Sequence, residues 1–245
     1  MKSLLSFAKI TPLALSALLL GSCSDDSSDG DTAGSAGTGG GAGSAGSAGT
    51  GGGAGSAGSS GTGATAMSFF VTSAGSGADG GNLGGLTGAD ERCQDFAAAV
   101  GAGSKTWRAY LSTSTVNARD RIGSGPWFNQ AGDQITATVA ALHTDGLSNG
   151  NPQHILDETG TPAPGNEHDI LTGSLADGTI NGTLTCADWT SNDAALTGQP
   201  QVGHSDIPPA QFSPSWNAAH TARDCSQAGL VATGGAGRLY CFAIN

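Results

Sequence analysis

The sequence predicts one α+β domain over residues 67–245, preceded by a long segment that has no core of its own. Within this range one stretch shows the apolar spacing of a helix, and two others alternate as strands do. All four tryptophans, both tyrosines and four of the five cysteines also fall inside it. A range of this length is sufficient to bury a single core.

The predicted helix covers residues 86–101. Its apolar residues share one face, at Ala89, Cys93, Phe96, Ala97 and Val100. Thr87, followed three residues later by Asp90, is typical of a helix start, and Gly101 is typical of a helix end. We therefore expect the Cys93 side chain to face the core.

A strand is predicted directly after the helix, and another closes the domain. Residues 106–112 alternate, with Trp107, Ala109 and Leu111 on one side. Residues 238–245 alternate in the same way, with Leu239, Cys241 and Ala243 on one face. An early helix packed against a closing strand gives a compact α+β domain.

The stretch between these two strands is less regular. Residues 114–122 predict a second short helix. Residues 123–167 are rich in turn-forming residues and predict long irregular loops.

Residues 1–22 are typical of a signal peptide, with lysines followed by an apolar run too short to span a bilayer. The segment ends in Leu20-Gly21-Ser22-Cys23, which resembles a lipobox, where the cysteine thiol takes the lipid. An ordinary signal peptide with a stray cysteine is the alternative. Because only polar residues follow Cys23 directly, we expect lipidation there, and an anchor rather than a membrane span.

Residues 23–66 predict a flexible tether. From residue 30 onward the segment contains only glycine, serine, alanine and threonine, apart from Asp31. A twelve-residue unit beginning at Gly37 recurs from Gly49 with one change. The repeat has no large apolar residue to bury, so it predicts a linker rather than a solenoid. Its average end-to-end distance is on the order of 30–35 Å.

The charge of the domain excludes two classes of partner. Seven basic residues lie beyond the signal segment, against sixteen acidic residues from Asp79 onward. Such a surface repels phosphate backbones and sulfated glycans, so we expect neither nucleic acid nor heparin as a partner. Acidity that simply keeps an exported protein soluble is at least as good an explanation of the charge as a role in binding cations.

Four cysteines remain besides Cys23, namely Cys93, Cys186, Cys225 and Cys241. An even number in an exported chain predicts two disulfides, for which three pairings exist. No two of them have the Cys-x-x-Cys spacing of a zinc ribbon or a redox site.

Several blocks along residues 67–245 resemble endostatin, the C-terminal domain of collagens XV and XVIII. These blocks are 84–93, 100–101, 106–112, 170–178, 186–189, 197–199, 225 and 239–242. The chain is also similar to a family of bacterial lectin-like lipoproteins through residues 125–127, 168–173 and 201–204. This resemblance implies the C-type-lectin-like fold, with two nested disulfides, Cys93–Cys241 and Cys186–Cys225.

The ligands of those families do not carry over. The sequence lacks both the tripeptide and the strand motif by which C-type lectins bind calcium and sugar. The nearest match to the tripeptide, Gln199-Pro200-Gln201, has no carboxylate at its last position. The arginines are dispersed rather than clustered for heparin, and the N-terminal zinc site of endostatin has no counterpart near Met67. The resemblance therefore indicates a fold and leaves the function open.

One short motif suggests an enzyme. Residues 146–150 match the Gly-x-Ser-x-Gly elbow of serine hydrolases, with Ser148 as nucleophile. The elbow works only between a buried strand and a helix, whereas this match lies in a predicted loop. We expect no catalytic residue, and a serine hydrolase is the least favoured of three alternatives.

All five histidines lie between residues 143 and 220, at His143, His154, His168, His204 and His220. None has the spacing of a local metal motif, so a shared site requires the fold to gather them. We interpret them as structural histidines that fix loops, and we expect no cofactor and no resident metal.

The function that we expect is a non-enzymatic, lectin-like binding module, lipid-anchored in the bacterial cell envelope at the outer membrane. Its partner is a glycan, bound without the usual calcium triplet, and an adhesion or scaffold module for a cell-surface protein is the alternative. Tryptophans can stack on sugar rings while polar neighbours hold the hydroxyls. The expected ligand residues are Trp127, Asn129, His204, Asp206 and Trp216. A second account places both tryptophans in the core, where they pin loops.

The anchor can be tested with Cys23→Ser. Because the serine hydroxyl cannot take the lipid, we expect the protein to move from the membrane fraction to the soluble fraction, which immunoblotting of separated fractions measures. A variant that stays in the membrane fraction contradicts lipidation at Cys23.

Overall fold

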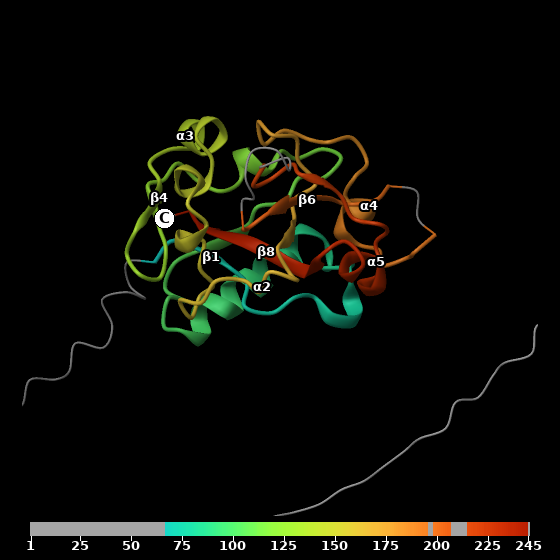
Figure 1. The fold of residues 1–245 in the computed structure, drawn as a ribbon, viewed down its shortest axis with the longest axis horizontal. Helices are drawn as coiled ribbons and strands as arrows, with labels where there is room; N and C mark the ends of the chain where they lie inside the picture. Colours follow the sequence, from blue (N-terminus) through green and yellow to red (C-terminus); the bar gives the residue numbers. More distant parts are fainter. Residues whose placement is uncertain (1–66, 196–197, 207–214, 245) are drawn as a thin grey trace, which may run out of the picture. The chain divides into compact units, whose positions relative to one another are not determined.

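The structure is a computed structural model, and it describes residues 67–195, 198–206 and 215–244 (Figure 1). The expected signal segment 1–22, the lipidation site Cys23 and the tether 23–66 lie outside the described residues. No helix in the described ranges combines the length and the apolar character needed to cross a bilayer.

The domain is a mixed structure of short elements. The helices are α2 (Gly85–Ala99), α3 (Val139–Thr144), α4 (Cys186–Trp189) and α5 (Gln227–Val231). The strands are β1 (Phe69–Val71), β2 (Trp107–Ala109), β3 (Trp127–Phe128), β4 (Gln134–Thr136), β5 (Asp169–Leu171), β6 (Gln201–His204), β7 (His220–Thr221) and β8 (Gly235–Ala243). Short 3-10 turns cover Gly77–Asp79, Ala118–Asp120, Leu147–Gly150 and Pro152–His154. The predicted α+β class is confirmed.

Strand β8 organises the main sheet. It pairs antiparallel with β1 and β2 and parallel with β5. The sheet then continues outward from β5 through β6 to β7, in the order β1-β8-β5-β6-β7. All nine residues of β8 are buried.

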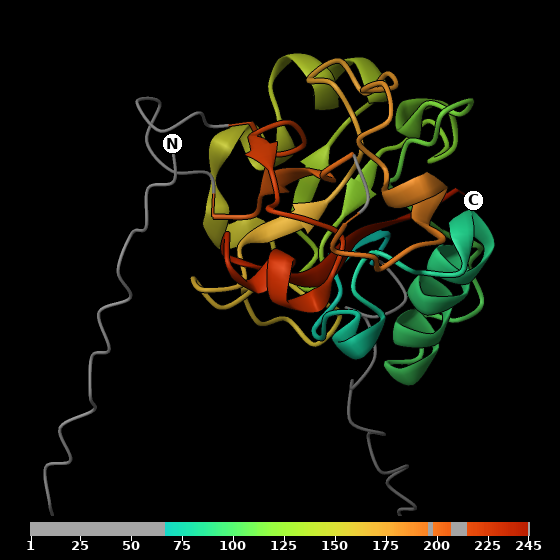
Figure 2. The same cartoon turned by 90° about the vertical axis from the view of Figure 1, so that its right-hand side faces the viewer.

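The two faces of β8 belong to two different parts of the core. Leu239, Cys241 and Ala243 pack in one cluster with the buried face of α2. Tyr240 and Phe242 pack in the other, together with side chains from α3, β3 and β4. In Figures 1 and 2, α2 and α3 accordingly lie on different sides of β8. The expected face of Leu239, Cys241 and Ala243 is therefore confirmed, and a second buried face lies behind it.

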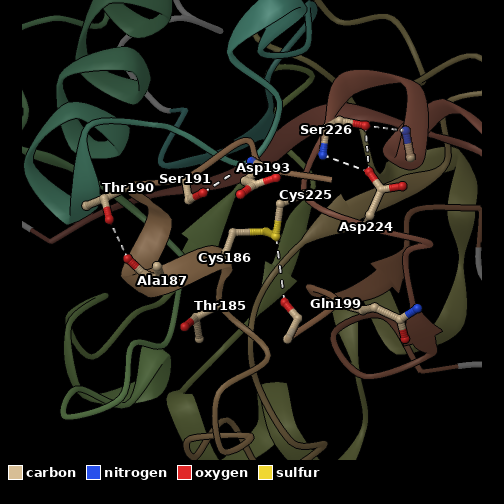
Figure 3. Close-up of a disulfide and its surroundings, with 12 residues drawn as sticks. Thr185, Cys186, Ala187, Thr190, Ser191, Asp193, Gln199, Asp224, Cys225 and Ser226 are labelled. Atoms are coloured by element: carbon tan, nitrogen blue, oxygen red, sulfur yellow. Dashed lines mark hydrogen bonds between the residues drawn. A yellow bond between two sulfur atoms is a disulfide. The ribbon is translucent and has the colours of Figure 1, made fainter. Parts of the chain in front are cut away.

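The two disulfides join Cys93 to Cys241 and Cys186 to Cys225, as the resemblance implied. The first ties α2 to β8, and both of its cysteines are fully buried, so the expectation for Cys93 is confirmed. The second ties α4 to the turn before α5 (Figure 3). In that turn the Ser226 hydroxyl donates to Asp224 and accepts from the Gly229 amide, which caps α5.

Two local predictions are wrong. The helix expected over 86–101 is α2, but it begins after Gly84 rather than at Thr87, and the Asp90 carboxylate does not cap it but accepts from the Ala109 amide and from two arginines. The helix expected over 114–122 is only the 3-10 turn Ala118–Asp120. There the Ser112 hydroxyl accepts from the Ala118 amide and links the turn to the chain after β2.

The long loops are partly ordered into elements that the sequence did not predict. The hairpin of β3 and β4 and the helix α3 both fall within residues 123–167. Thr138 caps α3, since its hydroxyl accepts from the Ala141 amide. Only β3, β4 and α3 are regular strands or α-helices there, so much of this stretch remains irregular as expected.

Removing each disulfide by paired cysteine-to-alanine changes should destabilise the domain unequally. The Cys93–Cys241 bond spans 148 residues of sequence and the Cys186–Cys225 bond spans 39. Loop-closure entropy then predicts losses within roughly 2–5 kcal/mol, the first being larger by about 1 kcal/mol. Urea unfolding of the two double variants measures the difference. A larger loss from Cys186→Ala/Cys225→Ala contradicts this account.

Candidate functional site

A group of polar side chains meets at one end of the main sheet. Asp169 begins β5, and its register partner His204 ends the antiparallel strand β6. His220 begins β7, which is antiparallel to β6, and it lies opposite Val202. Because residues 202 and 204 point to the same face of β6, Asp169, His204 and His220 share one face and one end of the sheet.

Two further residues complete the group. His168 directly precedes β5, and its carbonyl accepts from the Ser205 amide just beyond β6. Asp206 lies one residue further along the chain. We call His168, Asp169, His204, Asp206 and His220 the histidine–aspartate cluster.

Three imidazoles converge on a single carboxylate oxygen. The Nε2 atoms of His168 and His204 lie 3.3 Å from Asp169 Oδ1, and that of His220 lies 3.4 Å from it. Charge-assisted N–H···O bonds are shorter, at about 2.7–2.9 Å. The contacts to Asp169 are therefore long and weak, and among the described residues neither carboxylate oxygen of Asp169 and neither ring nitrogen of His204 makes a well-formed hydrogen bond.

The centre of the cluster is buried and one side of it is open. The Asp169 side chain is 1% exposed and that of His204 is 9% exposed, whereas that of His220 is 39% exposed. Buried polar atoms without partners typically cost about 1–3 kcal/mol each, and charged ones cost more. The described residues therefore leave the most buried part of the cluster unsatisfied.

Asp169 carries a negative charge at neutral pH. Burial by itself raises its pKa, but His204 and His220, with help from His168, hold the pKa at about 2. The same carboxylate raises the pKa of His220, against the effect of partial burial. The cluster is thus an anionic centre surrounded by imidazole nitrogens.

Backbone carbonyls set the tautomers of two histidines. His168 Nδ1 lies 2.6 Å from the Gly165 carbonyl oxygen, and His220 Nδ1 lies 3.1 Å from that of Thr221. A carbonyl only accepts, so each Nδ1 carries a hydrogen and donates it. In the neutral ring, Nε2 then presents a lone pair toward Asp169.

Gly203, beside the cluster, lies so close to the backbone at Trp216 that only glycine fits there. A Cβ atom on Gly203 would lie 1.8 Å from the Trp216 carbonyl oxygen. That contact brings the chain at Trp216 against β6 beside His204, and the His204 amide donates to the Ser215 carbonyl. The residue before His204 therefore has no room for a side chain.

The structure corrects three of the five expected ligand residues. Trp127 and Trp216 are 1% and 5% exposed, so neither offers a ring face to a sugar. The Trp127 indole donates to the Ala243 carbonyl, and the Trp216 indole donates to that of Leu142. Both rings pack on aromatic side chains in the core cluster behind β8. They pin irregular segments to the core, as the second account expected.

Asn129 is also fully buried, and its amide is occupied. The amide nitrogen donates to the His154 carbonyl and to Asp133, and its oxygen accepts from the Asp133 backbone. It holds the β3–β4 turn and has no free group for a ligand. Of the expected set, His204 and Asp206 alone lie in the histidine–aspartate cluster.

The other two histidines match the structural interpretation. His143 Nδ1 donates to the Val139 carbonyl, and Nε2 lies 2.7 Å from the Tyr110 hydroxyl. His154 Nε2 lies 3.2 Å from the Asn151 amide nitrogen, outside the cluster. His204 differs, because neither of its ring nitrogens is hydrogen-bonded to a loop among the described residues.

Sequence reasoning missed His168, Asp169 and His220 as site residues. A signal was present, because His168 and Asp169 are adjacent and all the histidines fall between residues 143 and 220. The pairing of β5, β6 and β7 brings three of the five histidines together, which the sequence alone does not show.

Ser148 does not have the setting of a catalytic elbow. It lies in the 3-10 turn Leu147–Gly150, which follows helix α3 rather than a buried strand. Its hydroxyl is buried and has no hydrogen-bond partner, so no histidine of the described residues is bonded to it as a base.

No protein-family model matches the chain, and no curated protein matches it. The resemblance to endostatin therefore remains a prediction, and the function is inferred from the chemistry of the described residues.

Alanine substitution of the two buried tryptophans should destabilise the domain strongly. Trp127→Ala and Trp216→Ala each remove a large buried ring and should lower the free energy of unfolding by roughly 3–5 kcal/mol. Leu175→Ala is the control, because Leu175 is 45% exposed and its truncation should change stability by less than about 0.5 kcal/mol. Thermal melts measure all three. An unchanged Tm in a tryptophan variant contradicts the core assignment.

Proposed function

We propose that this chain is a lipid-anchored binding module of the bacterial cell envelope, with the C-type-lectin-like, endostatin-like fold. Its ligand is a glycan, held beside the histidine–aspartate cluster rather than on tryptophans. Two nested disulfides in an α+β domain, behind a lipobox-like segment, support an exported module. The domain reaches its partner on the tether 23–66.

The observation that carries the proposal is a hollow next to the cluster. It has a volume of about 210 Å³, and Ser205 and Asp206 form its polar wall together with Gln153. The apolar wall contains Pro152, Ile155, Pro162 and Ala163. A sugar presents the same two kinds of surface, C–H groups on a ring face and hydroxyls around its rim. The Asp206 side chain, 46% exposed, is placed to accept hydrogen bonds from such hydroxyls.

The hollow suits a small group rather than a long segment of chain. Pockets for drug-sized ligands are about 300–1,000 Å³, and this one is smaller. We therefore expect it to take one sugar unit, such as a terminal residue of a polysaccharide. With no calcium triplet in the sequence, hydrogen bonds and apolar contact supply the affinity.

The surface gives less support to a protein–protein adhesion module. A stable protein interface needs a contiguous apolar patch at its centre. Among the described residues three large apolar side chains are exposed, Leu175, Val231 and Ile244, and each belongs to a different part of the fold. A glycan is thus the better match for the exposed chemistry.

A glycan array tests the proposal, using the exported chain extracted in mild detergent, with and without added calcium. We expect binding that calcium does not change. Asp206→Asn should weaken it by roughly 10- to 100-fold, the value of a hydrogen bond to a charged group. Asp120→Asn is the matched control, because Asp120 is 61% exposed and lies outside the hollow. No binding to any glycan contradicts the proposal and favours the adhesion module.

A further inference from the structure

We propose that Asp169, His204 and His220 form a binding site for a divalent transition-metal ion, with Zn²⁺ as the first choice. This departs from the expectation of structural histidines without a metal. The site goes beyond the proposed glycan binding and stands whether or not a sugar binds in the hollow beside it. The three side chains each offer a ligand atom, and these atoms lie within 4.8 Å of one another.

The spacing of the donor atoms is that of ligands around one ion. Zinc binds imidazole nitrogen and carboxylate oxygen at about 2.0–2.1 Å, so two ligands of a tetrahedral ion lie about 3.3–3.4 Å apart. The distances from Asp169 Oδ1 to Nε2 of His204 and of His220 are 3.3 and 3.4 Å. They are too long for strong hydrogen bonds and match two edges of that tetrahedron, while the ligand nitrogens of the two imidazoles lie within 4.8 Å of each other.

The tautomers also favour a cation between these groups. His220 donates its Nδ1 hydrogen to the Thr221 carbonyl, so its neutral ring turns a lone pair toward the Asp169 carboxylate. Two electron-rich atoms facing each other repel unless a proton or a metal ion lies between them. A metal-bound histidine usually donates its other ring hydrogen to a carbonyl or a carboxylate, which is the arrangement at His220.

Unsatisfied buried atoms point independently to a missing partner. Asp169 is 1% exposed and His204 is 7% exposed, yet both oxygens of the first and both ring nitrogens of the second lack a well-formed hydrogen bond to any described residue. A proton shared with His168 or His220 can satisfy one oxygen atom at most. A metal ion bound to Asp169 Oδ1 and to His204 Nε2 gives one of these atoms in each residue a partner at the same time.

A second grouping in the same cluster is less suitable. His168, His204 and Asp206 also offer ligand atoms within 4.8 Å of one another. However, His168 Nδ1, the atom 3.9 Å from Asp206, already donates its hydrogen to the Gly165 carbonyl. The ring of His204 contacts those of both His168 and His220, with centroids 4.9 Å apart in each pair, so His204 belongs to either set. The second grouping is the weaker one because its carboxylate, Asp206, is 46% exposed and meets His168 through that blocked nitrogen, whereas the Asp169 side chain is 1% exposed.

The donor set selects the kind of metal. Two imidazoles and one carboxylate suit zinc, cobalt, nickel, copper or iron, whereas calcium and magnesium prefer oxygen ligands alone. Three protein ligands leave at least one coordination position for water or another external ligand. The partly exposed ring of His220 marks the side from which such a ligand enters.

Metal titration of the whole exported chain, without a histidine tag and stripped by a chelator, tests the site. Zn²⁺ content after dialysis gives the stoichiometry, and the visible absorption of bound Co²⁺ reports tetrahedral coordination and its displacement by Zn²⁺. The ligand variants are Asp169→Asn, which keeps the side-chain shape, and His220→Gln, on the two-residue strand β7. The matched control is His154→Gln, a histidine of equal exposure (39%) that lies 4.0 Å from Asp133 but outside the cluster.

We expect one tightly held Zn²⁺ per chain in the native protein and in His154→Gln, and no competition by Ca²⁺. Asp169→Asn and His220→Gln should each lose more than roughly 100-fold in affinity, since even a lost partner behind a ligand costs about 10- to 100-fold. Background binding by the acidic residues near Cys23 is common to all variants. If Asp169→Asn fails to fold, His220→Gln decides the result.

Three results overturn the proposal. They are the absence of saturable Zn²⁺ and Co²⁺ binding, an affinity in His220→Gln equal to that of the native chain, and an equal loss in His154→Gln. None of these depends on the glycan array, and a failed array leaves the metal titration unaffected. The two proposals therefore fail separately.

Discussion

The domain depends on one strand that is buried on both of its faces. Alternate side chains of β8 enter two different core clusters, one against α2 and one against the hairpin and helix of residues 127–144. The Cys93–Cys241 bond then ties α2 to the same strand. Because both core clusters pack against β8 and three strands pair with it, the surrounding elements can be short, with irregular chain between them.

The histidine–aspartate cluster follows from that arrangement. Strand β8 holds β5 in parallel pairing, β5 holds β6, and β6 holds β7, so the cluster forms at the end of a chain of pairings that starts in the core. A polar site needs such a rigid framework, because buried charges are tolerated only where their partners are held in place. The half-buried ring of His143 is satisfied by a carbonyl and a tyrosine hydroxyl, whereas the more deeply buried ring of His204 has no hydrogen-bond partner among the described residues.

Two different ligand chemistries are proposed on neighbouring surfaces, and one residue joins them. Asp206 belongs to the cluster and also lines the hollow beside it. Under these two proposals a sugar unit in the hollow would lie next to the imidazoles, and a metal ion bound by them would lie next to the sugar. The net negative charge of the domain favours cations and disfavours sulfated glycans, which is the basis of the expectation that heparin does not bind.

The sequence by itself determined the α+β class, the helix that carries Cys93, the buried face of the closing strand and, through the resemblance, the disulfide pairing. The helix and the strand face can be read from short stretches of sequence, because the period of apolar residues reveals which face of a helix or strand is buried. Only the tertiary structure decided that Trp127 and Trp216 are core residues and that Asp169, His204 and His220 meet. The residues near a tryptophan in the sequence do not show whether its ring is buried. Residues on three different strands share a site only if the register of the strands brings them together. Register is set by packing across the whole sheet, which no local pattern contains.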